Sequence, residues 1–383
     1  MVTGRGRGIK YVSFAEPSGY GVAGKRCLLA LAEAGADLTW APMVPKLGGP
    51  MHYGQFRGTG VGDREIDQYC NRAIDYDLVI VHTVPEYFPH WIEAERPRKV
   101  IGHTVWETTA IPSHWRALLN MVDHLIVPCA WNKKVFQEGG VTVPISVVPH
   151  IVEVPIAAST CPPADNDGYV FYTIGTWTHR KSLFYTVKAY CEAFTAADPT
   201  TLIIKTAPRD FTATGLWHRF SRSTADALKR LTRQYRNPPR IRLITDELSE
   251  SEIRRLHQRG DCYVSLCRTE GWGIGAFDAA SYGNPVVMTG FGGQLDYLDP
   301  NLSYLIGYEL VPVINPSAPR SYSPDQRWAE PDIEHGAAML REVMARPDAA
   351  KARACRLQNR ILERFSARPV SDCLLTTLDR VRA

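Results

Sequence analysis

Short apolar runs recur along the first half of the chain at spacings that fit an α/β fold. These runs are unbroken and do not alternate with polar residues, a pattern typical of strands that are buried on both faces. Segments long enough for helices separate them, such as 25–34 and 113–122. The pattern therefore predicts a parallel sheet covered by helices. The predicted strands are 9–14, 37–41, 77–82, 99–103, 124–128 and 145–149.

The pattern stops at a polar, proline-rich stretch and then starts again. Residues 152–168 include Pro155, Pro162 and Pro163, and their Asp165-Asn-Asp167 triplet is interpreted as a turn and not as a metal site. A chain of 383 residues is long enough for two domains. We therefore predict an N-terminal domain at 1–155, a linker at 156–168 and a C-terminal domain at 169–360. The second set of strands is predicted at 169–174, 201–205, 241–244, 262–267 and 286–288.

Composition and charge favour an ordinary globular protein. Hydrophobic residues make up 45% and charged residues 22%, and the net charge is +4, which by itself does not indicate a nucleic-acid or membrane partner. The nine cysteines include no pair of C-x-x-C motifs, so we expect reduced, buried thiols. No apolar run reaches the roughly 18 residues of a membrane span. We expect a soluble, cytoplasmic protein.

Two groups of residues in the first half are candidates for a ligand site. Gly19 and Gly21 lie in a predicted loop after the first strand, where glycines let the backbone approach a ligand closely, or only form a tight turn. The loop lacks the GxGxxG motif and following acid of a dinucleotide site, which disfavours NAD. His103 and Glu107 flank the end of a predicted strand, where open α/β sheets bind ligands. A structural, buried His103 is the alternative, and His82 and His150 are interpreted as structural.

Cations are concentrated at two places in the second half. Arg180 and Lys181 lie between a predicted strand and a helix, where side-chain charge and free backbone N–H groups together favour an anion. A plain surface pair is the alternative. Residues 220–242 carry seven basic residues and one acid, which fits a solvated helix face or a surface for an anionic acceptor, lipid headgroup or nucleic acid. We also expect the proline-rich residues 310–332 to be irregular and 333–365 to be helical.

The stretch 269–287 combines a glycine-rich turn with two acids. It follows an apolar run, passes into an Ala-rich predicted helix and ends at Gly283-Asn-Pro285 before the next apolar run. A helix N-terminus suits a phosphate and nearby carboxylates suit sugar hydroxyls, so the stretch points to a nucleotide-sugar site. The candidate residues are Glu270, Gly273, Ile274, Gly275 and Asp278.

Several motifs resemble the retaining glycosyltransferases of family 4, which have the GT-B fold. Segments 127–132 and 147–150 are similar to the family's approach to its interdomain linker, and 175–181 to its phosphate-binding turn. Residues 270–278 resemble its E-x7-E signature. Asp278 replaces the second Glu of that signature, and Thr176 replaces an Arg, so Arg180 is expected to take that role.

The resemblance implies two Rossmann-like domains that face a central cleft, with residues 361–383 forming a helix that packs back on the N-terminal domain. Glu270 would bind the donor sugar, Asp278 the ribose, and Arg180 and Lys181 the diphosphate. His103 would lie near the sugar. The backbone at Gly19, Gly21 and 273–275 would approach the donor, a nucleotide-diphosphate sugar with UDP or GDP favoured. No cofactor and no metal are expected.

The sequence leaves other functions open. They are another GT-B enzyme, such as a phosphorylase or a nucleotide-sugar epimerase, and an anionic-surface or nucleic-acid-binding protein that uses residues 220–242. A pyridoxal-dependent phosphorylase would need a Schiff-base lysine, which no motif identifies. The acceptor hydroxyl, on a small molecule, glycan, lipid or protein, is not specified. Nucleic acid is disfavoured as a partner, and peripheral membrane contact stays open.

Overall fold

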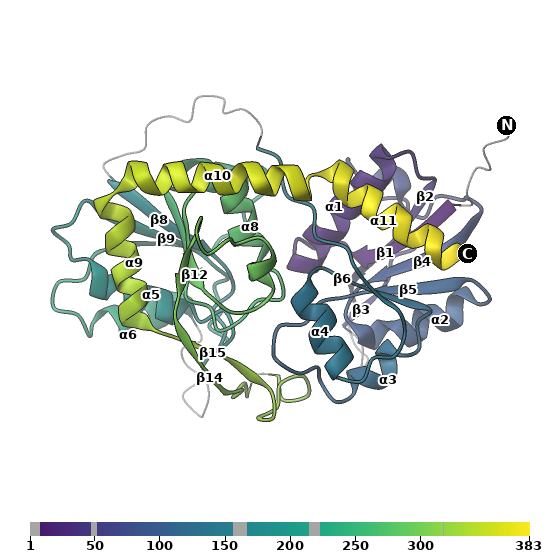
Figure 1. Ribbon diagram of the computed structural model, residues 1–383, viewed down its shortest axis with the longest axis horizontal. Helices are drawn as coiled ribbons and strands as arrows, with labels where there is room; N and C mark the ends of the chain where they lie inside the picture. The colour runs from purple at the N-terminus through teal and green to yellow at the C-terminus, as the bar shows by residue number, and fades with distance from the viewer. Residues whose placement is uncertain (1–7, 47–51, 156–166, 214–222, 317) are drawn as a thin grey trace. The chain divides into compact units, whose positions relative to one another are not determined.

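The chain forms two compact units. The computed structural model describes residues 8–46, 52–155, 167–213, 223–316 and 318–383 (Figure 1). The N-terminal unit comprises Met1–Trp106, Ile111–Ile151 and Arg364–Ala383, and the C-terminal unit comprises Glu107–Ala110 and Val152–Glu363. Most of the predicted linker, residues 156–166, lies outside the described part of the chain.

The N-terminal unit is built on a seven-stranded sheet in the order β3-β2-β1-β4-β5-β6-β7. All neighbouring strands pair in parallel except β3, which runs antiparallel to β2. The buried faces of these strands explain the unbroken apolar runs of the sequence. The strands are β1 (Gly8–Phe14), β2 (Leu38–Pro45), β3 (Tyr53–Gln55), β4 (Tyr76–His82), β5 (Lys99–His103), β6 (His124–Val127) and β7 (Ile145–Val147).

The last helix of the chain belongs to the N-terminal unit. Apolar residues of α11 (Ala367–Arg382), including Leu374 and Leu378, share one buried core with Leu28 and Leu31 of α1. Figure 1 shows α11 lying across α1, which contacts it directly. The other helices of this unit are α1 (Gly19–Glu33), α2 (Phe88–Glu95), α3 (Trp115–Leu119) and α4 (Ala130–Glu138).

The C-terminal unit is built on a six-stranded parallel sheet in the order β10-β9-β8-β11-β12-β13. Its strands are β8 (Tyr169–Ile174), β9 (Thr200–Lys205), β10 (Arg240–Ile244), β11 (Cys262–Ser265), β12 (Val286–Thr289) and β13 (Tyr304–Ile306). Its helices are α5 (Leu183–Ala193), α6 (Thr224–Thr232), α7 (Glu250–Arg259), α8 (Ile274–Ser281), α9 (Ile333–Ala345) and α10 (Pro347–Phe365), the last of which ends just inside the N-terminal unit.

Both sheets follow the doubly wound order, in which the strand sequence reverses direction at one point. That point lies between β1 and β4 in the N-terminal unit and between β8 and β11 in the C-terminal unit. Open α/β sheets bind ligands at the carboxyl ends of the strands beside such a point. The predicted α/β class with two Rossmann-like units is confirmed.

One local prediction was wrong. Residues 310–332, predicted as irregular, contribute to an antiparallel ribbon of β14 (Tyr308–Pro312) and β15 (Arg327–Pro331). These two strands are stabilised by pairing with each other, which the propensity of either segment alone does not encode. The prediction that residues 333–365 are helical is confirmed. They form two helices, since α9 ends at Ala345 and Pro347, which cannot donate a backbone hydrogen bond, begins α10.

The cysteines only partly match their prediction. Eight of the nine lie in the described residues, and all eight are free thiols. Six of them are buried, as predicted, whereas Cys355 is half-buried and Cys373 is exposed. None of the helices in the described part of the chain is long and apolar enough to cross a membrane.

Candidate functional site

Three predicted site residues meet at the switch point of the C-terminal unit. Arg180 and Lys181 lie on the loop that follows β8, and Glu270 lies on the loop that follows β11. Because β8 and β11 are neighbours in the sheet, the two loops leave the same edge side by side. The strand order of the sheet therefore brings together residues that are 89 and 90 positions apart in the sequence.

Several hydrogen bonds fix the two loops to each other. Ser182, the residue before α5, has a left-handed backbone (φ 38°, ψ 47°), and its buried hydroxyl donates to the carbonyl oxygen of Leu266 at 2.8 Å. The backbone N–H of Arg268 donates to the carbonyl oxygen of Arg180 at 2.9 Å. The Arg268 guanidinium donates to the carbonyl oxygen of His179 at 3.1 Å. A strained backbone held by such contacts is common at functional sites.

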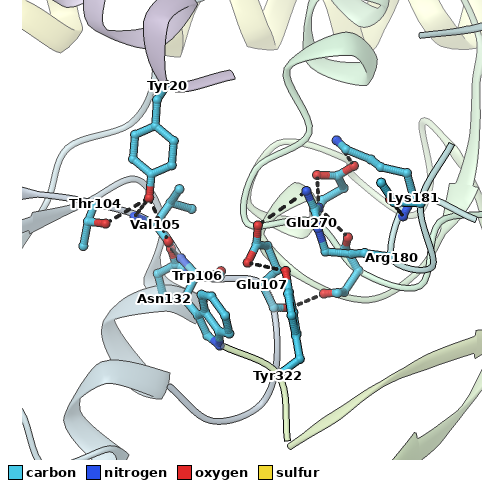
Figure 2. Close-up of polar contacts among 12 residues, drawn as sticks. Tyr20, Thr104, Val105, Trp106, Glu107, Asn132, Arg180, Lys181, Glu270 and Tyr322 are labelled. Carbon is cyan, nitrogen blue, oxygen red and sulfur yellow. Dashed lines mark hydrogen bonds and ion pairs between the residues drawn. The ribbon is translucent and has the colours of Figure 1, made fainter. Parts of the chain in front are cut away.

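The Glu270 carboxylate is bound by both cations. The guanidinium of Arg180 donates to Oε2 at 2.9 Å and to the carbonyl oxygen of Thr269 at 3.2 Å, and the ammonium group of Lys181 donates to Oε1. Figure 2 shows the two cations converging on this carboxylate. The Glu270 side chain is only 8% exposed, so its charge is compensated by direct pairing and hardly by water.

The surroundings keep this pair charged. Burial raises the pKa of Glu270, but Lys181 and Arg180 together outweigh burial, and the net pKa of the carboxyl is lowered. For Arg180, burial lowers the pKa, but Glu107 and Glu270 outweigh it and hold the pKa above its ordinary value. Both ions are thus stable in a largely enclosed site, where their electrostatic effects are stronger than in water.

Glu107, predicted from the sequence to flank the end of a strand with His103, belongs instead to the cluster of Arg180, Lys181 and Glu270. Its Oε1 lies 3.5 Å from the Arg180 guanidinium, and its Oε2 accepts a hydrogen bond from the Tyr322 hydroxyl at 3.4 Å (Figure 2). His103 lies in the other unit. The chain passes from the N-terminal unit to the C-terminal unit at Glu107 and returns at Ile111. No local pattern in the sequence predicts this short excursion.

The glycine-rich turn leads into α8 as predicted. Gly273 precedes the helix with φ 87°, a conformation that favours glycine. A Cβ atom at Gly275 would lie 2.8 Å from the Tyr263 hydroxyl, so this glycine also lets the helix pack closely on the sheet. Ile274 is the first helical residue. Asp278 lies in the second turn, is 4% exposed, and accepts a long bond of 3.5 Å from the backbone N–H of Glu153.

The predicted glycine loop of the N-terminal unit is helical. Helix α1 begins at Gly19, because the Ser18 hydroxyl caps it by accepting from the backbone N–H of Gly21 at 3.2 Å. A Cβ atom at Gly21 would lie 1.8 Å from the carbonyl oxygen of Glu16, whereas one at Gly19 would meet no atom within 4 Å. Gly21 is therefore required by packing, independently of any ligand.

We expect Gly21→Ala to lower the free energy of unfolding by about 2–4 kcal/mol, because its Cβ overlaps backbone that cannot move freely. Gly19→Ala is the matched control. It should be neutral or stabilising by up to about 1 kcal/mol, since alanine favours helix. Urea denaturation of both variants checks this prediction, and equal stability of the two would contradict the packing argument.

His103 is part of a buried group of three histidines. It is 0% exposed, and neither ring nitrogen has a hydrogen-bond partner within the described ranges. It stacks on His82 with ring centroids 3.7 Å apart and planes 7° from parallel, since the two residues are in register on β4 and β5. His82 Nδ1 lies 2.8 Å from the Tyr11 hydroxyl, and His150 packs nearby with centroids about 6 Å away.

The histidine group is the one place in the described residues where three potential metal ligands converge, with their ligand atoms within 4.8 Å of one another. A ligated ion lies in the plane of each imidazole that binds it, so two rings stacked in parallel at 3.7 Å cannot share an ion in this orientation. Burial lowers the pKa of all three, that of His150 to about 3. The group is therefore neutral.

Residues 162–309 match the family model of the glycosyl transferases group 1. This match covers the loop with Arg180 and Lys181, the loop with Glu270 and the start of α8. Most of the C-terminal unit is therefore similar to the glycosyl transferases group 1. No curated protein sequence matches the chain.

Solved structures share the fold over nearly the whole chain. Sucrose-phosphate synthase from Thermosynechococcus elongatus is 13% identical, with a TM-score of 0.68 and coverage of 98% of this chain and 99% of that one. HepE from Anabaena, solved with UDP and glucose, is 12% identical, with a TM-score of 0.65 and coverage of 98% and 100%. An E. coli trehalose-6-phosphate protein bound to UDP-2-fluoro glucose is 12% identical, with a TM-score of 0.67 and coverage of 97% and 98%. The fold is GT-B.

Proposed function

We propose that this protein transfers a sugar from a nucleotide-diphosphate sugar to a hydroxyl acceptor, with retention of the anomeric configuration. The observation that carries the proposal is the pairing of Arg180 and Lys181 with Glu270 at the switch point of a GT-B sheet. Two cations beside one buried carboxylate suit a ligand that joins a diphosphate to a polyhydroxyl ring.

The chemistry follows from the charges. When the bond from the sugar to the diphosphate breaks, negative charge builds up on the leaving phosphate. Arg180 and Lys181, whose backbone is held in place by the loop contacts of Ser182 and Arg268, stabilise that charge. Glu270 accepts hydrogen bonds from sugar hydroxyls in place of the bonds that it accepts from the two cations.

The other predicted residues complete the donor site in this proposal. Asp278 binds the ribose, and the backbone N–H groups at the start of α8, after Gly273, face the phosphate or the sugar. From the N-terminal unit, we assign His103 to the sugar, because a neutral, buried imidazole with unpaired nitrogens can donate to or accept from a hydroxyl.

The donor most strongly supported is a UDP-sugar. Solved structures with the same fold contain UDP with glucose and UDP-2-fluoro glucose. We also propose that Arg180 and Lys181 supply the positive charge that stabilises the leaving diphosphate, so that no metal ion is needed for this role. Removal of metal ions with EDTA should then leave the transfer activity unchanged. Retention follows from the resemblance of residues 270–278 to the E-x7-E signature, and the leaving phosphate would take the acceptor proton.

The basic segment 220–242 lies partly on helix α6. Helix α6 covers only Thr224–Thr232, and residues 220–222 lie outside the described ranges. Lys229 and Arg230 lie in the last turn of α6, where positive charges interact favourably with the helix dipole. The Arg230 guanidinium also lies 3.9 Å from the Asp210 carboxylate. These contacts fit a solvated helix face, so we assign no acceptor class from them.

A screen of nucleotide sugars tests the proposed function. A donor at 100 times its Kd stabilises the folded state by about 2.7 kcal/mol, which corresponds to an increase of roughly 5–10 °C in Tm. We expect a UDP-sugar to raise the Tm more than UMP, because UMP lacks the second phosphate. Absence of a shift with UDP, GDP, TDP and ADP sugars alike would contradict the proposal.

A further inference from the structure

Four residues of the N-terminal half of the sequence form a strap on the C-terminal unit. The chain leaves the N-terminal unit after Trp106 and returns to it at Ile111, and Glu107–Ala110 between them belong to the C-terminal unit. The inference below concerns Glu107 on this strap and rests on the proposed function, because it concerns the same diphosphate site.

The strap is fixed by specific hydrogen bonds. The hydroxyl of Thr108 donates to Gln326 Oε1 at 3.0 Å, and both side chains are fully buried. Thr109 bonds to Arg327 twice, through its N–H to the Arg327 carbonyl oxygen at 3.1 Å and through its hydroxyl, which accepts from the Arg327 N–H at 2.8 Å. The backbone beside Glu107 is thus held independently of the Glu107 carboxylate.

The Glu107 carboxylate lies loosely against the cations that we assign to the diphosphate. Its distance of 3.5 Å to Arg180 is longer than the 2.9 Å between Arg180 and Glu270, and its bond from the Tyr322 hydroxyl is also long, at 3.4 Å. The Glu107 and Arg180 side chains keep 18% and 19% of their surfaces exposed. The carboxylate can therefore leave Arg180 without breaking a short bond.

Glu107 also completes the charge balance of the site. Arg180 and Lys181 carry two positive charges and Glu270 carries one negative charge, so the three alone have a net charge of +1. With Glu107 the net charge is zero. An arriving diphosphate brings additional negative charge and would be repelled by a carboxylate that remained beside Arg180.

We propose that Glu107 is a displaceable internal anion. It neutralises Arg180 in the donor-free protein and gives up that place to the diphosphate of the donor. Glu107 thereby weakens nucleotide binding, which favours release of the nucleoside diphosphate after transfer. A permanent positioning role for Glu107 makes the opposite prediction, because its loss would then misplace Arg180 and weaken binding.

The test is the affinity of the full-length protein and its Glu107→Gln variant for UDP, GDP and inorganic pyrophosphate, measured by isothermal titration calorimetry. Glutamine has nearly the same size, and its amide oxygen can still accept from Tyr322. The bond from the Thr269 hydroxyl goes to the Glu107 backbone oxygen and is retained. We expect the variant to bind about three- to ten-fold more tightly, with a difference that shrinks at high salt.

Asp299→Asn is the control for net charge, since Asp299 pairs with Arg360 on the same unit and not with the site. Its nucleotide affinity should equal that of the wild type. Equal or weaker binding by Glu107→Gln would overturn the inference and leave the proposed function in place. Failure of both proteins to bind any of the three ligands would overturn the proposed function and the inference together.

Discussion

Replacing Lys181 by methionine is expected to lower the turnover number of sugar transfer by about 100- to 1,000-fold, the effect of losing one preorganised charge from a transition state. Methionine fills nearly the same volume, so the Gly175–Lys181 loop keeps its packing. Arg180 still binds Glu270, which limits the effect on folding. Steady-state kinetics with the donor found in the screen would measure the change, with urea denaturation to confirm stability.

Lys188→Met is the matched control for this variant. Lys188 lies on the following helix, α5, and its ammonium group is 5.6 Å from the Tyr185 ring centroid, with no contact to Glu270 in the described residues. Its turnover should stay within about two-fold of the wild type, as is usual for substitutions away from a site. Similar losses in the two variants would show that Lys181 acts through general stability and not on the leaving group.

Acidification from pH 7.5 to pH 5 is expected to remove much of the stability of the N-terminal unit. His82, His103 and His150 are buried, and burial lowers their pKa values, so the folded state keeps them neutral while the unfolded chain binds protons below about pH 6.5. Their stabilising contribution is present above that pH. It is lost progressively as the pH falls toward each folded pKa, about 3 for His150.

The size of this effect is comparable to the stability of a domain. One histidine that stays neutral on folding loses about 2 kcal/mol between pH 7.5 and pH 5, so three lose about 6 kcal/mol, against a typical total of about 5–15 kcal/mol. Urea denaturation at the two pH values, with hydrogen exchange of the β4 and β5 amides, would locate the loss in this unit.

His82→Phe separates this cause from general acid denaturation. Phenylalanine can still stack on His103 but cannot bind a proton. The loss of the hydrogen bond between His82 and Tyr11 lowers the stability at both pH values alike. We expect the variant to lose about 2 kcal/mol less than the wild type between the two pH values. An identical loss would show that His82 does not titrate on unfolding.

The sequence was sufficient for the sheets and for much of the candidate site. Unbroken apolar runs identified the strands because both faces of each strand are buried. Arg180, Lys181 and Glu270 were found because each follows such a run, and parallel strands deliver their following loops to one edge of the sheet. The predicted roles of these residues stay predictions until they are measured.

Other features could not be found from local patterns. Glu107 joins the site through a change of unit that lasts four residues and depends on Gln326 and Arg327, far along the chain. Gly19 and Gly21 were interpreted as a loop because glycine usually disfavours helix. The cap of Ser18 and the close approach of α1 to Glu16 reverse that preference.

The most direct test of the central claim is ¹H and ³¹P NMR of the full-length protein with a UDP-sugar and a panel of hydroxyl acceptors, beside its Glu270→Ala variant. The account predicts that the wild type releases UDP and forms a glycoside with the anomeric configuration of the donor. The variant should do neither at a measurable rate. Two results would contradict the account. One is full transfer by the Glu270→Ala variant, and the other is a wild-type protein that leaves the donor uncleaved with every donor and acceptor in the panels.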